Sequence, residues 1–259
     1  MAHALDGARE RLKRADENVK NLALEINPFI SSLPIIPFTG DPPKFAEADR
    51  QKWGMLTSAR TNIPLRWSVL AGEIVHHMRA AFDHVAWQLS SPSYRSSNTT
   101  QIEFPIYSFD PSTDKDKLRR YQGKVEGISK PSALARIESL QPYKAGNRFA
   151  HPLWLIHDLD RIDKHRELVL FVHALHTNIK IEASVPTLVI QEPFKTKPSR
   201  VIPIGIPSDY MEVKGQITGQ IALDKSLTGT GQSEPVVPFL ENLLRFAVNS
   251  IESFSGEFI

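Results

Sequence analysis

The sequence contains no cysteine among its 259 residues. This absence excludes disulfide bonds, thiolate metal ligands and a cysteine nucleophile. Neither sign of charge dominates, because 31 basic side chains are matched by 29 acidic ones, for a formal net charge of +2. So close a balance predicts no strong overall attraction to nucleic acids or anionic membranes, although it leaves room for a local basic patch.

Long apolar runs are also missing. The longest, LVLFVHAL (168–175), is far shorter than the roughly 20 residues that a membrane-spanning helix needs. The first 17 residues are rich in charge and contain no apolar signal core. We therefore expect a soluble, cytoplasmic protein that does not enter a membrane. Its composition, 41% hydrophobic and 23% charged, is typical of a globular protein with a sizeable core.

Hydrophobic spacing predicts helices at both ends of the chain and in its middle. The predicted helices span residues 3–26, 63–89, 132–140, 152–168 and 236–255. Between residues 169 and 224, segments rich in Val and Ile are separated by Pro and Gly, which favours about three or four antiparallel strands. A further short strand is predicted at 52–59, after a proline-rich segment without regular structure (28–51).

No internal repeat and no strong linker divide the sequence. We therefore interpret residues 1–259 as one α+β domain, in which a helical core of two long, polar-flanked helices is joined by a C-terminal antiparallel sheet and a closing helix. The first helix has a heptad-like apolar stripe, so it packs on this core or forms a dimeric coiled coil. Small alanines at alternate stripe positions favour core packing.

The histidines gather in two segments: eight of the nine lie within residues 76–84 and 151–176. With roughly 100° of rotation per residue, His77 and His84 both lie beside the apolar stripe of the helix that carries the first segment. Arg79 points away from that stripe. This helix is therefore predicted to have two polar flanks rather than one.

In the 152–168 helix, Arg166 falls inside the apolar stripe. A guanidinium is costly to bury without a partner, so we expect it to pair with a carboxylate. Asp163 on the same helix and Asp83 on the other polar helix are the leading candidates. The two helices would then pack side by side around an ion-pair network.

A metal site is another interpretation of these groups. EIVH (73–76) is an E-x-x-H element of the kind that di-iron helical bundles use, but the chain has no second copy. A mononuclear site built from His77, His84 and an aspartate or histidine of the second helix stays open, because imidazole nitrogens and a carboxylate suit zinc or iron.

The segment RAAFDH (79–84) has the pattern R-x4-H. Over these six residues it resembles the signature of the HEPN ribonucleases, helical proteins that cleave RNA without a metal in a dimer cleft. The resemblance implies that His84 is the general acid and base and that Arg79 is the phosphate clamp. Such roles suit an imidazole that carries a proton and a guanidinium that neutralises a phosphate.

A broader similarity covers much of residues 62–170. It rests on RAAFDHVAWQL (79–89), FPIY (104–107), LQPY (140–143) and HPLWLIHDLDRIDKHREL (151–168). Together these segments are similar to an uncharacterised bacterial family with an LR-x-ALDH helix and a later DKHR helix. The resemblance implies no activity, but it implies that the two polar helices belong to one site or one structural core.

These patterns define the candidate site. The catalytic candidates are Arg79, Asp83, His84 and His165, and the binding candidates are His77, Asp163, Lys164 and Arg166. The leading hypothesis is a nuclease-like enzyme that acts on RNA as a homodimer, with no metal or other cofactor. The competing hypotheses are a non-enzymatic module that binds a small molecule or a protein, its polar helices held by a structural ion-pair network, and a mononuclear metal-dependent hydrolase.

Overall fold

A computed structural model describes residues 3–39, 63–183 and 211–258 of the chain. By its internal contacts the chain divides into two compact units. The helical unit comprises residues 1–27, 64–171 and 222–259, and the strand unit comprises residues 28–63 and 172–221. The single domain expected from the sequence stays a prediction, because two compact units can belong to one domain.

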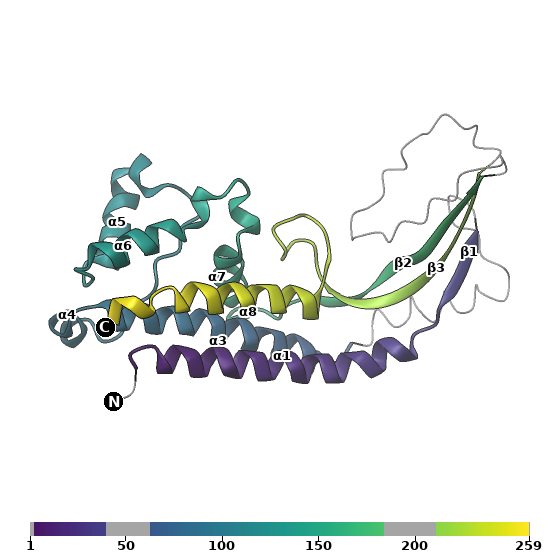
Figure 1. Cartoon of the computed structure of the whole chain (residues 1–259), viewed down its shortest axis with the longest axis horizontal. Coiled ribbons are helices and arrows are strands. Elements are labelled where there is room, and N and C mark those ends of the chain that lie inside the picture. The colour runs from purple at the N-terminus through teal and green to yellow at the C-terminus, as the bar shows by residue number, and fades with distance from the viewer. Residues whose placement is uncertain (1–2, 40–62, 184–210, 259) are drawn as a thin grey trace. The chain divides into compact units, whose positions relative to one another are not determined.

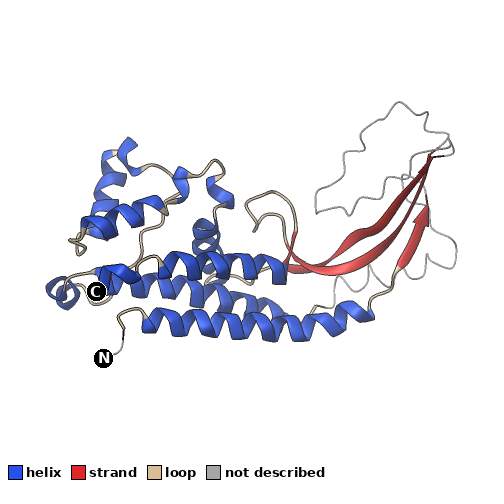
Figure 2. Cartoon of the chain, viewed as in Figure 1, coloured by secondary structure: helices blue, strands red, loops and turns tan. Residues whose placement is uncertain are grey.

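The predicted α+β class is confirmed, with long helices, a small antiparallel sheet and a helix near the C-terminus (Figures 1 and 2). The helices and strands are α1 (Asp6–Ser32), β1 (Ile36–Thr39), α3 (Leu65–Leu89), α4 (Pro92–Ser97), η1 (Pro111–Thr113), α5 (Lys115–Val125), α6 (Pro131–Ser139), η2 (Pro142–Lys144), η3 (Arg148–Ala150), α7 (Pro152–Asp163), β2 (Leu170–Ala183), β3 (Met211–Leu223), β4 (Glu234–Pro235), α8 (Val236–Glu252) and η5 (Ser255–Phe258). No described helix is long and apolar enough to cross a membrane.

Helix starts follow local sequence signals. Pro131 and Pro152 begin α6 and α7, as predicted, because proline needs no hydrogen-bond acceptor in the first turn. The side chain of His151 caps α7 by accepting a hydrogen bond from the backbone N–H of Leu153. Helices α4 and α5 form between residues 90 and 131, where the sequence predicted no helix. At α5, Asp114 provides an N-cap carboxylate.

In the helical unit, α3 packs against both α7 and α8. Phe104, which follows α3 in the chain, places its ring 5.1 Å from that of Phe82 and 6.2 Å from that of Phe254 (centroid to centroid). All three rings are buried. The core of this unit therefore contains aliphatic side chains along the helices and one aromatic cluster, formed by Phe82, Phe104 and Phe254.

The first helix joins the same unit through its residues up to 27. Its predicted stripe is buried in the single chain, as the core-packing interpretation requires: Leu5, Ala8, Leu12, Ala15, Val19, Leu22 and Ile26. At its N-terminal end, Arg9 donates two hydrogen bonds of 2.8 Å to the carboxylate of Glu252 on α8. This bidentate ion pair lowers the pKa of Glu252.

The sheet has the order β1-β3-β2, and β4 pairs with the end of β3. Strand β1 runs antiparallel to β3, with Ile36 opposite Ile217. It lies within residues 28–51, for which no regular structure was expected. The strand predicted at 52–59 and any strands between 184 and 210 lie outside the described residues.

Helix α7 ends at Asp163, five residues before the predicted end at 168. The chain then turns, and Leu168 and Leu170 are buried while Val169 between them is 56% exposed. That alternation has the period of two expected for a strand. The apolar residues after 163 therefore lead into β2. The prediction that the helix and its apolar stripe continue to residue 168 is wrong.

Candidate functional site

The polar side chains of α3 form two groups. The Arg79 network contains Arg79, Asp83, Glu103 and Lys124. The α3–α7 groove is lined by Val69, Glu73, His76, His77, Asp163 and Glu167. The network surrounds a buried guanidinium with partly exposed partners, whereas the groove is open, so the two groups have different chemical possibilities.

Arg79 is only 5% exposed. Its Nη1 donates to Asp83 Oδ1 at 2.5 Å, and its Nη2 donates to the backbone carbonyl oxygen of Phe104 at 3.2 Å. Arg79 was predicted to point away from the apolar stripe of its helix, yet its side chain is buried. The physical reason is that the Phe104 carbonyl oxygen and the Glu103 carboxylate lie over this side of α3 and, with Asp83, provide the partners that a buried guanidinium requires.

Asp83 binds both Arg79 and the backbone of Phe104. The same Oδ1 accepts a hydrogen bond of 2.8 Å from the backbone N–H of Phe104. Burial raises the pKa of Asp83, while Arg79 and the Phe104 N–H act in the opposite direction. Lys124 of α5 forms an ion pair with Glu103, and burial lowers the pKa of Lys124. The charges of the network therefore largely satisfy one another.

His84 lies on another side of α3, against α1. A Cβ atom added to Gly7 would come within 2.9 Å of His84 Nδ1. Five residues of helix separate Arg79 from His84, which places them about 140° apart around the axis. Burial lowers the pKa of His84, and the charge of Arg11 adds to this effect. Within one chain, the arginine and histidine of the R-x4-H pattern thus face different neighbours.

His76 faces α7. Its Nδ1 lies 2.9 Å from Oδ1 of Asp160, a residue only 3% exposed. Lys164 places its Nζ 2.6 Å from the other carboxylate oxygen, Oδ2. The predicted binding residue Lys164 thus belongs to an ion-pair group centred on Asp160. Sequence reasoning missed Asp160, although its spacing of four from Lys164 is the signal of a helical ion pair.

His157 was also missed. Burial lowers its pKa to about 4, and the nearby charge of Arg79 contributes. Its ring packs against Trp154, with centroids 5.7 Å apart. At neutral pH this histidine is therefore uncharged, as is His77, whose pKa is lowered by burial and by the charges of His76, Arg11 and Arg14.

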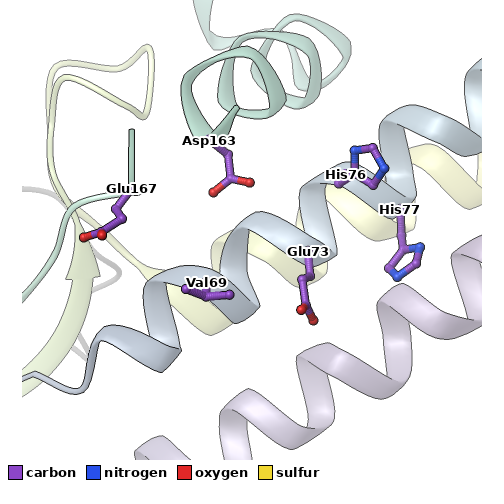
Figure 3. A pocket seen from close by; sticks show the side chains of 6 residues that line it. All are labelled: Val69, Glu73, His76, His77, Asp163 and Glu167. Atoms are coloured by element: carbon purple, nitrogen blue, oxygen red, sulfur yellow. The ribbon is translucent and has the colours of Figure 1, made fainter. Parts of the chain in front are cut away.

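The α3–α7 groove has a volume of about 360 Å³. Asp163 extends from the end of α7 toward α3, whereas Glu73 and His77 extend from α3 on the side of α1 (Figure 3). Glu73 accepts a hydrogen bond of 3.3 Å from the buried Asn18 of α1. The Nδ1 atom of His77 is buried and has no hydrogen-bond partner among the described residues. The groove therefore combines three carboxylates with two imidazoles.

The Asp163 carboxylate lies directly over Gly72 of α3. It accepts no hydrogen bond from the residues that the structure describes. Burial raises its pKa most, followed by the charge of Asp160, and Glu73 adds to this effect while His76 opposes it. An aspartate without a partner is therefore held in a groove that already contains negative charge.

The prediction that Arg166 forms an ion pair with Asp163 or Asp83 is wrong. Arg166 is exposed and forms no ion pair within the described ranges of the chain. Because α7 ends at Asp163, Arg166 and His165 have left the helix, and both side chains face solvent. Neither of them reaches the groove lining.

Among residues 3–39, 63–183 and 211–258, no three His, Cys, Asp or Glu side chains gather in an arrangement that could hold a metal ion. His77 and His84 stay without the third ligand that a mononuclear site on these helices would need.

No protein-family model matches the chain, and no curated protein or solved structure matches it either. The similarities to the HEPN ribonucleases and to the family with the DKHR helix therefore stay predictions.

We expect Asp83→Ala to destabilise the protein by about 3–5 kcal/mol, because it leaves the buried Arg79 guanidinium without its carboxylate. The matched control is Asp158→Ala, which removes a surface ion pair with Arg161, a side chain that is 63% exposed. That control should cost no more than about 1 kcal/mol. Urea denaturation of both variants measures the difference, and equal losses would contradict a structural role for the Arg79 network.

Proposed function

We propose that the chain is a non-enzymatic binding module and that the α3–α7 groove holds a small organic cation. The observation that carries this proposal is the charge of the lining. Glu73, Asp163 and Glu167 contribute carboxylates, and neither lysine nor arginine is among the lining residues that the structure describes. A positively charged ligand would relieve the mutual repulsion of these carboxylates, whereas a phosphate would add to it.

The shape and composition of the groove suit a small molecule. Its volume of about 360 Å³ lies within the range of sites that take small ligands. Val69 offers an apolar surface to the methylene groups of an alkylamine, and it is 49% exposed without a ligand. The groove is open to solvent, so each charged contact contributes only about 0.2–1 kcal/mol. We therefore expect dissociation constants of about 0.1–1 mM, equivalent to about 4–5.5 kcal/mol.

The Arg79 network supports this proposal over nuclease activity. A phosphate clamp needs an accessible guanidinium, but Arg79 is 5% exposed, and two of its N–H groups already bind Asp83 and the Phe104 carbonyl oxygen. Exchanging these partners for RNA would leave the partly buried Asp83 without its cation, at a cost of several kcal/mol. His84 lies against α1, away from the side of α3 that carries Arg79.

Spermidine is a suitable probe, because it has several positive charges joined by methylene groups. Calorimetric titration at low salt should give weak binding to the wild-type protein, and Asp163→Asn should reduce the affinity at least about fivefold, equivalent to about 1 kcal/mol. Asp158→Asn, on the same helix but outside the groove lining, is the control and should bind as the wild type does. Identical affinities in all three proteins, or no binding to any, would refute the proposal.

Spermidine binding should weaken as the pH falls from about 7 to about 4.5. The raised pKa of Asp163 means that this carboxylate gains a proton, and loses its charge, at a higher pH than an ordinary aspartate. Because its charged form is disfavoured in the folded state, Asp163→Asn should leave the melting temperature at pH 7 unchanged or higher. A pH-independent affinity, measured by the same titration, would show that Asp163 does not contact the cation.

RNA provides the test of the competing hypothesis. We expect RNA incubated with purified protein and a chelator to remain intact with both the wild type and His84→Ala, because Arg79 and His84 do not face a common space in one chain. Degradation by the wild type that is lost in His84→Ala would instead support a metal-independent ribonuclease. Gel analysis of the RNA separates the two results.

A further inference from the structure

Gly72 lies in the interior of α3 beneath the Asp163 carboxylate. A Cβ atom added at Gly72 would stand 2.0 Å from Asp163 Oδ1, 2.3 Å from Cγ and 2.5 Å from Oδ2. All three distances are shorter than any ordinary van der Waals contact. The whole carboxylate group, rather than only its tip, therefore occupies the place where any other residue would carry its side chain.

Glycine is unfavourable inside a helix, because it loses more backbone freedom on folding than alanine does. At position 72 no ordinary helix former fits while Asp163 keeps its place. The end of α7 has little freedom to move away, since Leu159 and Asp160 are buried at 1% and 3% exposure. A side chain at position 72 would therefore displace mainly the Asp163 carboxylate.

We infer that Gly72 is a positioning residue of the α3–α7 groove. Its missing side chain admits the Asp163 carboxylate onto the backbone of α3, so that an organic cation in the groove can contact this carboxylate. This inference rests on the proposed function, because it assigns the binding geometry to the same groove. The affinity of the groove for a cation then depends on Gly72, although Gly72 has no side chain that could contact the ligand.

The test uses the full-length wild type, Gly72→Ala, Asp163→Ala and the double variant, with spermidine as the probe. Gly72→Ala should reduce affinity at least about fivefold, as Asp163→Ala should, and the double variant should bind no more weakly than either single variant. Gly123→Ala is the matched control, because Gly123 also lies in a helix and an added Cβ would meet nothing within 4 Å. It should bind as the wild type does.

Melting temperatures give a second measurement that does not depend on spermidine. Gly72→Ala replaces a glycine that is unfavourable in a helix, but in the wild-type background its new methyl group has to displace the Asp163 carboxylate. In the Asp163→Ala background that obstruction is gone, so the same change should affect the melting temperature more favourably there than in the wild-type background. If Gly72→Ala alone does not fold, recovery of folding in the double variant supports the inference, and failure of both overturns it.

The failures of the two proposals are distinguishable. Wild-type protein that does not bind spermidine refutes the proposed function, while the melting temperatures still test whether Gly72 holds Asp163 in place. Wild-type protein that binds spermidine, together with a folded Gly72→Ala of unchanged affinity, overturns the positioning role and leaves the proposed function intact. Equal effects of Gly72→Ala on the melting temperature in both backgrounds also overturn it.

Discussion

The buried guanidinium of Arg79 is the constraint on which the arrangement of the helical unit depends. A charge that is 5% exposed needs several hydrogen-bond acceptors, and Asp83 and the Phe104 carbonyl oxygen provide them. Since Asp83 also accepts from the Phe104 N–H, both backbone groups of that residue are tied to α3. The Phe104 ring is thereby held between Phe82 and Phe254, so an ion pair sets the position of an aromatic core.

The polar groups between α3 and α7 are less completely paired than the Arg79 network. His76, Asp160 and Lys164 satisfy one another, but the Asp163 carboxylate finds no hydrogen-bond donor in the described part of the chain. Like charges that gather without partners raise the free energy of the folded chain, and a ligand that neutralises them lowers it. The contrast between a satisfied network and an unsatisfied groove is the physical basis for placing binding in the groove and structural support in the network.

Much of the fold was predictable from local signals. The starts of α6 and α7 follow from Pro131 and Pro152, and the buried stripe of α1 follows from its spacing. Two errors show where such signals fail. The end of α7 was missed because Val169 continues the helical spacing of Leu159 and Ile162, although it is exposed between the buried Leu168 and Leu170. Asp160 was missed because its burial depends on partners that only the folded chain provides.

The sequence by itself determined the fold class and the pairing of two polar helices, and it identified His77 and Asp163 among the groove residues, because helix and strand periods depend on neighbouring residues alone. Only the tertiary structure decided what those residues do. It buried Arg79 beneath residues 103 and 104, released Arg166 to solvent and set Asp163 over Gly72. Burial and charge pairing are properties of segments that meet in space, and no spacing along the chain specifies which segments those are.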